Sequence, residues 1–381
     1  MRRLVTGIFA AALAFGIGVA KADIKIGVVL PLTGPTSALG IPIKKGIELM
    51  PNEIAGEKIQ LTFLDDASDP SAAVRNAQKL ISDEKVDLLI GGAGSPAALA
   101  MAAVASREQI QLISLAPASY PADNSKWLVT IPSPAELWVK ALARDMKKRN
   151  VKTVAFIGFS DPFGDLCYNA LKEVATKEGL TVVTNERFAR ADTSLTGQIL
   201  KIIAAKPDAV FVGGSSTPGA LPHLALAERG YKGPVYNTPG IFTKDFLRVG
   251  GKAVEDTIAV TGPVGAYSQL PDSVASKKVS ADFVQKYDAQ NGAGSWNGIA
   301  ALGFDGGRVI ASAIPGALKK AKPGTPEFRA ALRDEIRSQP EVIGASGIYS
   351  FPQGNAYGVD DRAVITVQIK NGDWKLIDFV E

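Results

Sequence analysis

The chain has one cysteine, Cys167, and one histidine, His223, among its 381 residues. A lone cysteine forms no internal disulfide, so the fold must depend on its hydrophobic core, which a chain of this length can build. No nucleophile motif accompanies these two residues. A Ser/His/Asp or Cys/His catalytic set is not readily assembled from them. We therefore predict that the protein is not an enzyme.

Long apolar segments are also scarce, and the longest runs from Leu4 to Ala20. Arg2 and Arg3 precede it, and the small-residue sequence Ala20-Lys21-Ala22 follows it. This order is typical of a secretory signal peptide with its cleavage site. The run has 17 residues, whereas a helix needs roughly 20 to span a bilayer. We predict cleavage after Ala22 and a mature chain that spans no membrane.

Neither sign of charge is in large excess. The full chain has 42 basic and 38 acidic residues, but Arg2, Arg3 and Lys21 belong to the predicted signal peptide. The mature chain therefore carries 39 basic residues against 38 acidic ones. A nearly neutral surface gives no indication that the protein binds nucleic acid.

What the sequence does contain is a regular alternation of short apolar runs and helical patterns. Repeated βα units form parallel sheets, and apolar runs without polar alternation indicate strands covered by helices on both faces. The mature chain is too long for one ordinary core. We predict an α/β fold of two doubly wound parallel-sheet lobes. The strand-like runs are residues 24–30, 59–65, 86–92, 110–116, 151–159, 181–188, 208–214 and 234–240.

Local signals place some helix starts and one hairpin. A helix is expected to begin near Ala38, after a loop at residues 32–37. Ser71 is a candidate N-cap for a helix with Val74, Ala77 and Leu80 on one face. At the other end of the chain, two strand-like runs flank Asn371-Gly372, a pair that favours a β-hairpin turn.

Two motifs suggest cofactors that the surrounding residues do not support. Residues 92–97 match the pattern G-x-G-x-x-A, but a dinucleotide site also needs an acidic residue about twenty positions later. Residues 110–119 contain none. Asp65, Asp66 and Asp69 lack the spacing of a calcium loop, and Asp69-Pro70 is typical of a turn and a helix cap. We predict no cofactor and no metal ion.

Small, hydroxyl-rich loops follow the predicted strands. Ligands of doubly wound sheets bind outside the carboxyl ends of the strands, so two such lobes can form a cleft between them. Backbone N–H groups at helix starts, together with serine hydroxyls, suit a carboxylate. The loop at residues 32–37 is expected to line the edge of this cleft. The other loops are residues 94–95, 116–119, 161–164, 214–217 and 237–240.

Several of these segments, taken in order, resemble periplasmic binding proteins of the leucine/isoleucine/valine type, the solute receptors of ABC importers. The resemblance covers essentially the whole mature chain. It rests on IKIGVVLPLTGPTSALG, DDASDPSAAVRNAQKLI, LIGGAGSPAALAMAAVA, QLISLAPAS, VAFIGFSDPFGDL and DAVFVGG. It implies a periplasmic location and a membrane permease of an ABC importer as partner, and we expect a monomer.

The resemblance also implies two lobes joined by three crossovers. These are expected near residues 130–134, 261–263 and 346–349. The first lobe would then comprise residues 23–131 and 263–346, and the second lobe residues 132–262 and 347–381. Closure of the lobes on a solute would present a surface to the permease.

In this family the first lobe holds the carboxylate of the ligand. The resemblance places Ser95, the backbone at Ala116, and either Ala118 or Ser119 at these contacts. Phe163 occupies a position where amino-acid receptors often have a tyrosine. Around the cleft we also expect Ser215, Pro239 and Trp296, of which Trp296 has the alternative of an ordinary core position.

One departure from the family is informative. Receptors of α-amino acids need an acid for the ammonium group, supplied by the second lobe, but residues 236–241 contain no Asp or Glu. A buried charge left without its partner costs roughly 3–5 kcal/mol. The sequence therefore predicts a receptor for a hydrophobic, aromatic carboxylate, with Phe163, Trp296 and Phe242 as candidates for an apolar pocket. For Phe242, as for Trp296, the alternative is an ordinary core position.

Three alternatives remain open from the sequence. The protein could be a receptor for branched-chain or other aliphatic amino acids in which Asp161 or Asp165 accepts the ammonium group. It could be a secreted α/β enzyme, which the lack of a catalytic set disfavours. It could also deliver its closed form to a sensory membrane receptor instead of a permease.

Overall fold

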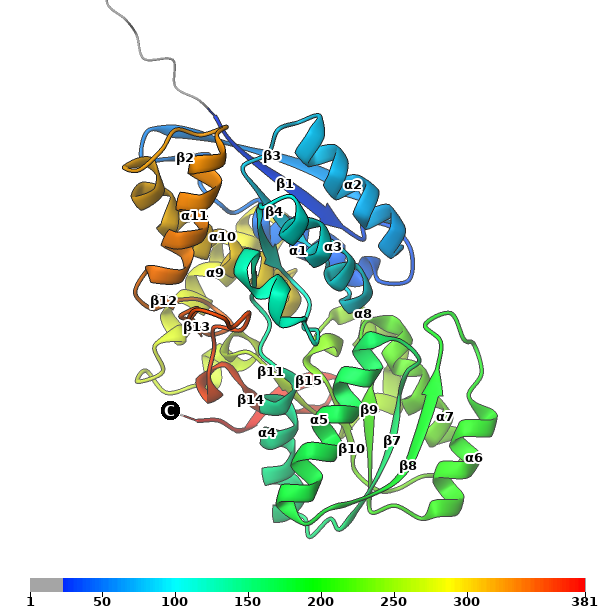
Figure 1. Cartoon of the computed structure of the whole chain (residues 1–381). Helices are drawn as coiled ribbons and strands as arrows, with labels where there is room; N and C mark the ends of the chain where they lie inside the picture. Colours follow the sequence, from blue (N-terminus) through cyan, green and yellow to red (C-terminus); the bar gives the residue numbers. More distant parts are fainter. Residues whose placement is uncertain (1–22, 381) are drawn as a thin grey trace, which may run out of the picture.

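A computed structural model describes residues 23–380, which fold into two lobes, one above the other in Figure 1. The predicted signal peptide, residues 1–22, lies outside the described residues. Within the described part, no helix is both long and apolar enough to cross a membrane.

The first lobe is built on a sheet with the strand order β2-β3-β1-β4-β5-β6. All neighbours in it pair in parallel except the short β2, which is antiparallel to β3. The strands are β1 (Ile24–Leu30), β2 (Glu53–Ile54), β3 (Glu57–Asp65), β4 (Leu88–Gly91), β5 (Gln111–Ser114) and β6 (Leu128–Thr130). Its helices are α1 (Ser37–Ile47), α2 (Pro70–Ser82), α3 (Ser95–Arg107), α9 (Ser276–Asn291), α10 (Gly298–Leu318) and α11 (Pro326–Ser338).

Strand β1 shows why both faces of this sheet are apolar. Ile26 and Val28 pack on one face with α1, α10 and α11. The next residue, Val29, points to the opposite face and packs with α2 and α3. Since successive side chains of a strand alternate between faces, a strand covered on both sides must be apolar throughout.

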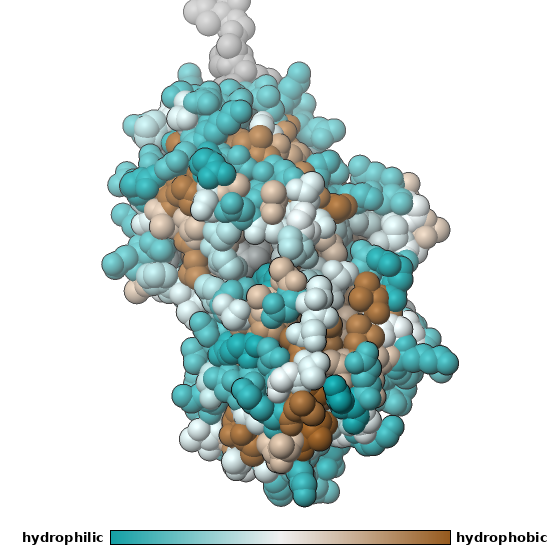
Figure 2. Space-filling model, turned by 90° about the vertical axis from the view of Figure 1, so that its right-hand side faces the viewer, coloured by the Kyte–Doolittle hydropathy of each residue, from teal (hydrophilic) through white to brown (hydrophobic). Residues whose placement is uncertain are grey.

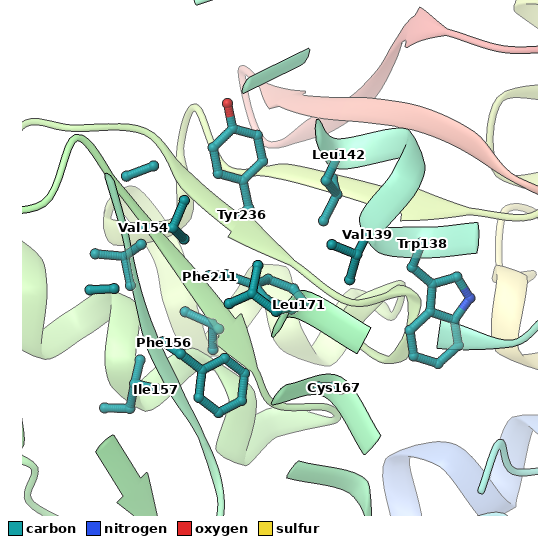
Figure 3. Packing of buried hydrophobic residues seen from close by; sticks show 14 of the residues in the cluster. Trp138, Val139, Leu142, Val154, Phe156, Ile157, Cys167, Leu171, Phe211 and Tyr236 are labelled. Atoms are coloured by element: carbon teal, nitrogen blue, oxygen red, sulfur yellow. The ribbon is translucent and has the colours of Figure 1, made fainter. Parts of the chain in front are cut away.

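The second lobe has a seven-stranded sheet with the order β15-β14-β11-β10-β9-β7-β8. Its core packs α4 and α5 against the sheet, with Trp138 and Leu171 from the helices and Phe156, Phe211 and Tyr236 from the strands (Figure 3). The strands are β7 (Thr153–Phe159), β8 (Thr181–Phe188), β9 (Ala209–Gly213), β10 (Val235–Asn237), β11 (Ile258–Thr261), β14 (Ile365–Lys370) and β15 (Asp373–Asp378). The helices are α4 (Ala135–Lys148), α5 (Pro162–Glu178), α6 (Thr196–Ala205), α7 (Leu221–Glu228) and α8 (Lys244–Gly250).

These two sheets confirm the predicted fold class of two doubly wound α/β lobes. The hairpin β14–β15 turns at Asn371-Gly372, both of which have positive φ, and it adds two antiparallel strands to the second sheet. Helix α1 begins at Ser37, close to the predicted start. The N-cap of α2 is Asp69 and not Ser71. The Asp69 carboxylate accepts from two backbone N–H groups of the first turn, and Pro70 fits the first helical position.

We propose that the third crossover comes later in the chain than residues 346–349. Tyr349 and Phe351 pack in the core of the first lobe. Tyr349 ends β13 (Ile348–Tyr349), which pairs with β12 (Val342–Ile343) in a small separate sheet. Val364 already belongs to the core of the second lobe. We therefore place this crossover at residues 359–364. For the lobes we propose residues 23–131 and 263–359, and residues 132–262 and 360–380.

Asp305, on α10, fastens a tight turn at residues 344–347 to the first lobe. Its side chain is fully buried. It accepts hydrogen bonds from the backbone N–H groups of Ala345 and Ser346, both at 2.7 Å, and from the Tyr349 hydroxyl at 2.9 Å. The carbonyl of Ala345 in turn accepts from the N–H of Val264 at 3.0 Å. This carboxylate thus joins α10 to the segment that follows the second crossover.

The only histidine and the only cysteine are both buried in the second lobe. Cys167 lies on α5 within the core, and burial raises the pKa of its thiol. His223 lies on α7, where Asn237 Nδ2 is 2.8 Å from its Nε2 and Thr257 Oγ1 is 3.2 Å from its Nδ1. Both residues therefore have structural roles inside the second lobe.

His223 makes stability depend on pH. Burial lowers its pKa from 6.5 to about 3. Between these values the unfolded chain binds a proton that the folded chain does not, so the free energy of unfolding falls as the pH drops from 6.5 towards 3. We expect the free energy of unfolding of His223→Gln to fall less steeply with decreasing pH than that of the wild type, by up to about 1.4 kcal/mol per pH unit. Urea denaturation of both proteins between pH 4 and 7 measures it, and parallel curves would contradict the expectation.

Candidate functional site

A cavity of about 790 Å³, which includes its solvent-open part, lies between the two lobes. In Figure 2 the surface narrows between the lobes, and residues of intermediate hydropathy (white) gather there. Residues from all three crossover regions line the cavity, namely Ser133, Gly262 and Ala363. The cavity therefore lies where relative movement of the lobes would change its shape.

The first lobe contributes the start of α3 and the loop after β5. Ser95 and Ala116 both line the cavity, as the resemblance implies, and both are buried. The Ser95 hydroxyl donates to the carbonyl of Pro117 at 2.6 Å. No side chain caps α3. Pro96 has no N–H and the N–H of Ala98 bonds to the carbonyl of Gly94, so the N–H groups of Ser95 and Ala97 are the donors of the first turn that can meet an anion.

The other two residues expected at this contact lie outside the cavity wall. Ala118 is buried, and its backbone N–H and carbonyl both bond to the Tyr357 hydroxyl, at 3.0 and 2.9 Å. Ser119 is exposed to solvent. Neither residue is among those that line the cavity. The chain leaves the cavity wall after Pro117, the last residue of this loop that lines it.

The second lobe contributes an aromatic wall. Phe163 lines the cavity, as expected, and its ring centroid lies 6.3 Å from that of Trp138, another lining residue. Ser215 and Pro239 also line it. Trp138 was not foreseen, because it falls within an ordinary amphipathic helix pattern.

Trp296 and Phe242 lie elsewhere. Both line a separate hollow at the edge of the second lobe, where Phe242 stacks on Trp374 with 4.5 Å between ring centroids. Trp296 packs its edge against Tyr267. Their positions match the core-packing alternative better than a contact with a ligand in the interlobe cavity.

Arg190 is the charged residue of the cavity wall that sequence reasoning missed. It follows β8, an edge strand, and its side chain is 17% exposed. Its Nε donates to Asp161 Oδ2 at 2.7 Å, and its Nη1 donates to the Ser215 hydroxyl at 3.3 Å. Among the described residues that line the cavity there is no Asp or Glu, and Arg190 is the one charged side chain.

The two acids proposed as alternative partners of an ammonium group are already occupied. Asp161 Oδ1 caps α5 by accepting from the N–H groups of Phe163 and Gly164, and Oδ2 pairs with Arg190. Asp165 pairs with Arg187 at 3.2 Å and is 67% exposed. Neither lines the main cavity, although Asp161 lines a smaller hollow that adjoins it at Arg190.

The acidic loop after β3 has a structural role. Asp65 accepts from the backbone N–H of Leu32 at 2.8 Å and from the Thr33 hydroxyl at 2.7 Å, which anchors the loop at residues 32–37. Asp69 caps α2. In the described part of the chain, these acids form no cluster suited to a metal ion.

Behind Arg190 and Gly94 the cleft continues into a smaller hollow. Thr36, from the loop at residues 32–37, lines this hollow together with Asp66. Burial raises the pKa of Asp66 to about 6. The loop therefore borders the cleft but not its main cavity.

The Ser95 hydroxyl bond allows a direct test. Because Ser95→Ala leaves the carbonyl of Pro117 without this donor, we expect it to lower the free energy of unfolding by about 1 kcal/mol, measured by urea denaturation. Ser106→Ala is the matched control on the same helix, since its hydroxyl lies 3.5 Å from its acceptor in an exposed contact. Equal stability of the wild type and Ser95→Ala would show that the hydroxyl is free to bind a ligand.

Comparisons with known proteins agree with this architecture. Residues 23–373 match the family described as periplasmic binding protein. The Leu/Ile/Val-binding protein BraC3 of Rhizobium johnstonii is 26% identical over 297 residues, which are 74% of this chain and 79% of that protein.

Among solved structures, an extracellular ligand-binding receptor of Rhodopseudomonas palustris HaA2 is 41% identical, with a TM-score of 0.91 over 94% of this chain and all of that one. An ABC-transporter solute-binding protein of R. palustris in complex with benzoate shares the fold at 20% identity, with a TM-score of 0.80 over 94% of this chain and 96% of that one. With its two α/β lobes and the cavity between them, the chain belongs to the periplasmic binding protein family, whose members are solute-binding receptors.

Proposed function

We propose that the protein is the solute receptor of an ABC importer and captures a small hydrophobic, aromatic monocarboxylate between its lobes. One observation carries the proposal: no Asp or Glu is found among the described residues that line the cavity. The site has hydrogen-bond donors and a positive charge for an acid, and it has no counter-charge for an amine.

The missing acid distinguishes carboxylates from amino acids. An α-amino acid brings an ammonium group, and a buried charge without a partner costs roughly 3–5 kcal/mol. This corresponds to about two to four powers of ten in affinity. A carboxylate without an amine avoids this cost completely.

The wall of the cavity favours an apolar, flat body for the ligand. Trp138 and Phe163 line one side, and Leu39, Ile43 and Leu302 come from the first lobe. Burial of an aromatic ring of about 150 Å² contributes roughly 4 kcal/mol. An aromatic ring would use more of this wall than a short aliphatic chain.

Two features of related proteins bear on the proposal. The solved neighbour that holds benzoate is described as the solute-binding protein of an ABC transporter, which supports both the ligand class and a permease as partner. Several relatives are named Leu/Ile/Val-binding proteins, and this favours a receptor for aliphatic amino acids as the second candidate. That candidate requires an acid in the cavity other than Asp161 and Asp165.

A panel of ligands separates these candidates. The chain from Asp23 to Glu381 is unfolded and refolded to remove bound solute, and its melting temperature is measured with benzoate, cinnamate, leucine, valine and phenylalanine. Ligands that bind only the native state raise this temperature. We expect benzoate or cinnamate to raise it and the amino acids to leave it unchanged. A rise with leucine or valine alone would contradict the proposal.

A further inference from the structure

We infer that Arg190, on the second lobe, binds the carboxylate of the ligand and gives the cavity its selectivity against amino acids. The inference rests on the proposed function and names the side chain responsible for it. The family resemblance implies a carboxylate held by the first lobe alone, so this residue changes the expected division of contacts between the lobes.

Arg190 is held in one orientation by three contacts. Its Nε donates to Asp161 Oδ2 at 2.7 Å, its Nη1 donates to the Ser215 hydroxyl at 3.3 Å, and its guanidinium lies over the Phe159 ring, 4.0 Å from the centroid. Such restraint lowers the conformational entropy that a long side chain loses on binding.

Asp161 is itself a fixed anchor. Its Oδ1 accepts from the backbone N–H groups of Phe163 and Gly164, at 2.9 and 3.2 Å, in the first turn of α5. The helix therefore fixes the carboxylate, and the carboxylate fixes the guanidinium. The positive end of the α5 dipole adds to the positive charge of Arg190 and offsets part of the negative charge of Asp161.

The guanidinium retains donors for a ligand. It has five N–H groups, and its bonds to Asp161 and Ser215 use two of them. Arg190 and Ser215 both line the main cavity. A carboxylate can accept two of the remaining N–H groups in the paired geometry that arginine favours.

The first lobe offers a complementary contact. The Ser95 hydroxyl is used by the Pro117 carbonyl, which leaves the backbone N–H groups of Ser95 and Ala97 at the start of α3, since Pro96 has none. Ser95 and Arg190 line the same cavity from opposite lobes. A carboxylate bound by both would hold the lobes together, whereas the ammonium group of an amino acid would be repelled by the guanidinium.

The test compares acids with their uncharged amides. Affinities of cinnamate, benzoate, cinnamamide and benzamide are measured by calorimetry for the wild type and for Arg190→Gln. We expect Arg190→Gln to weaken binding of the acids by about 30-fold or more and binding of the amides by less than about 3-fold. Arg248→Gln is the control arginine of the second lobe, because Arg248 forms an exposed ion pair with Asp245 and lies outside the cavity wall. It should leave all four affinities within about 3-fold.

A second variant keeps the result decisive. If Arg190→Gln does not fold, Arg190→Lys takes its place, because lysine retains a cation beside Asp161. The ammonium group of this lysine should bind the acids with intermediate affinity. Equal loss for acids and amides, or unchanged affinity for acids that the wild type binds, would overturn the inference and leave the proposed function standing. If the wild type binds none of the acids, the proposed function fails and the role of Arg190 fails with it.

Discussion

The arrangement of the cavity depends on one buried carboxylate, that of Asp305. It binds the turn at residues 344–347 to α10, and the carbonyl of Ala345 in that turn receives a hydrogen bond from Val264. Ser346, which lines the cavity, is therefore held against the second crossover. A site between two bodies keeps its shape only if the segments that connect them are fixed, and Asp305 supplies this constraint from inside the first lobe.

The chemistry of the site follows from where charges are placed and where they are lacking. Asp161 caps a helix and orients an arginine, so an acid close to the cavity does not act as a free anion in it. The remaining wall is apolar apart from hydroxyl groups. In the proposed function, the lack of an acid after β10 and the presence of Arg190 after β8 suit the cavity to an anion and not to a zwitterion.

Most of the fold was predictable because its central strands are continuous apolar runs covered on both faces. The strands β6 and β11 have only three and four residues, too few for a periodic signal. Ser95, Ala116, Phe163, Ser215 and Pro239 all line the cavity, since each follows a strand end that the alternation had located. Arg190 follows an edge strand and meets Asp161 across 29 positions of sequence. Such a contact depends on tertiary packing, as does the placement of Trp296 outside the cavity.

The burial of Cys167 has a practical consequence. A thiol inside the core with a raised pKa is protonated and shielded from reagents. A cysteine introduced on the surface would then be the one that reacts, without removal of the native residue. A dye attached near the rim of the cavity would report occupancy through its fluorescence, so the chain is already suited to serve as the scaffold of an optical sensor for its solute.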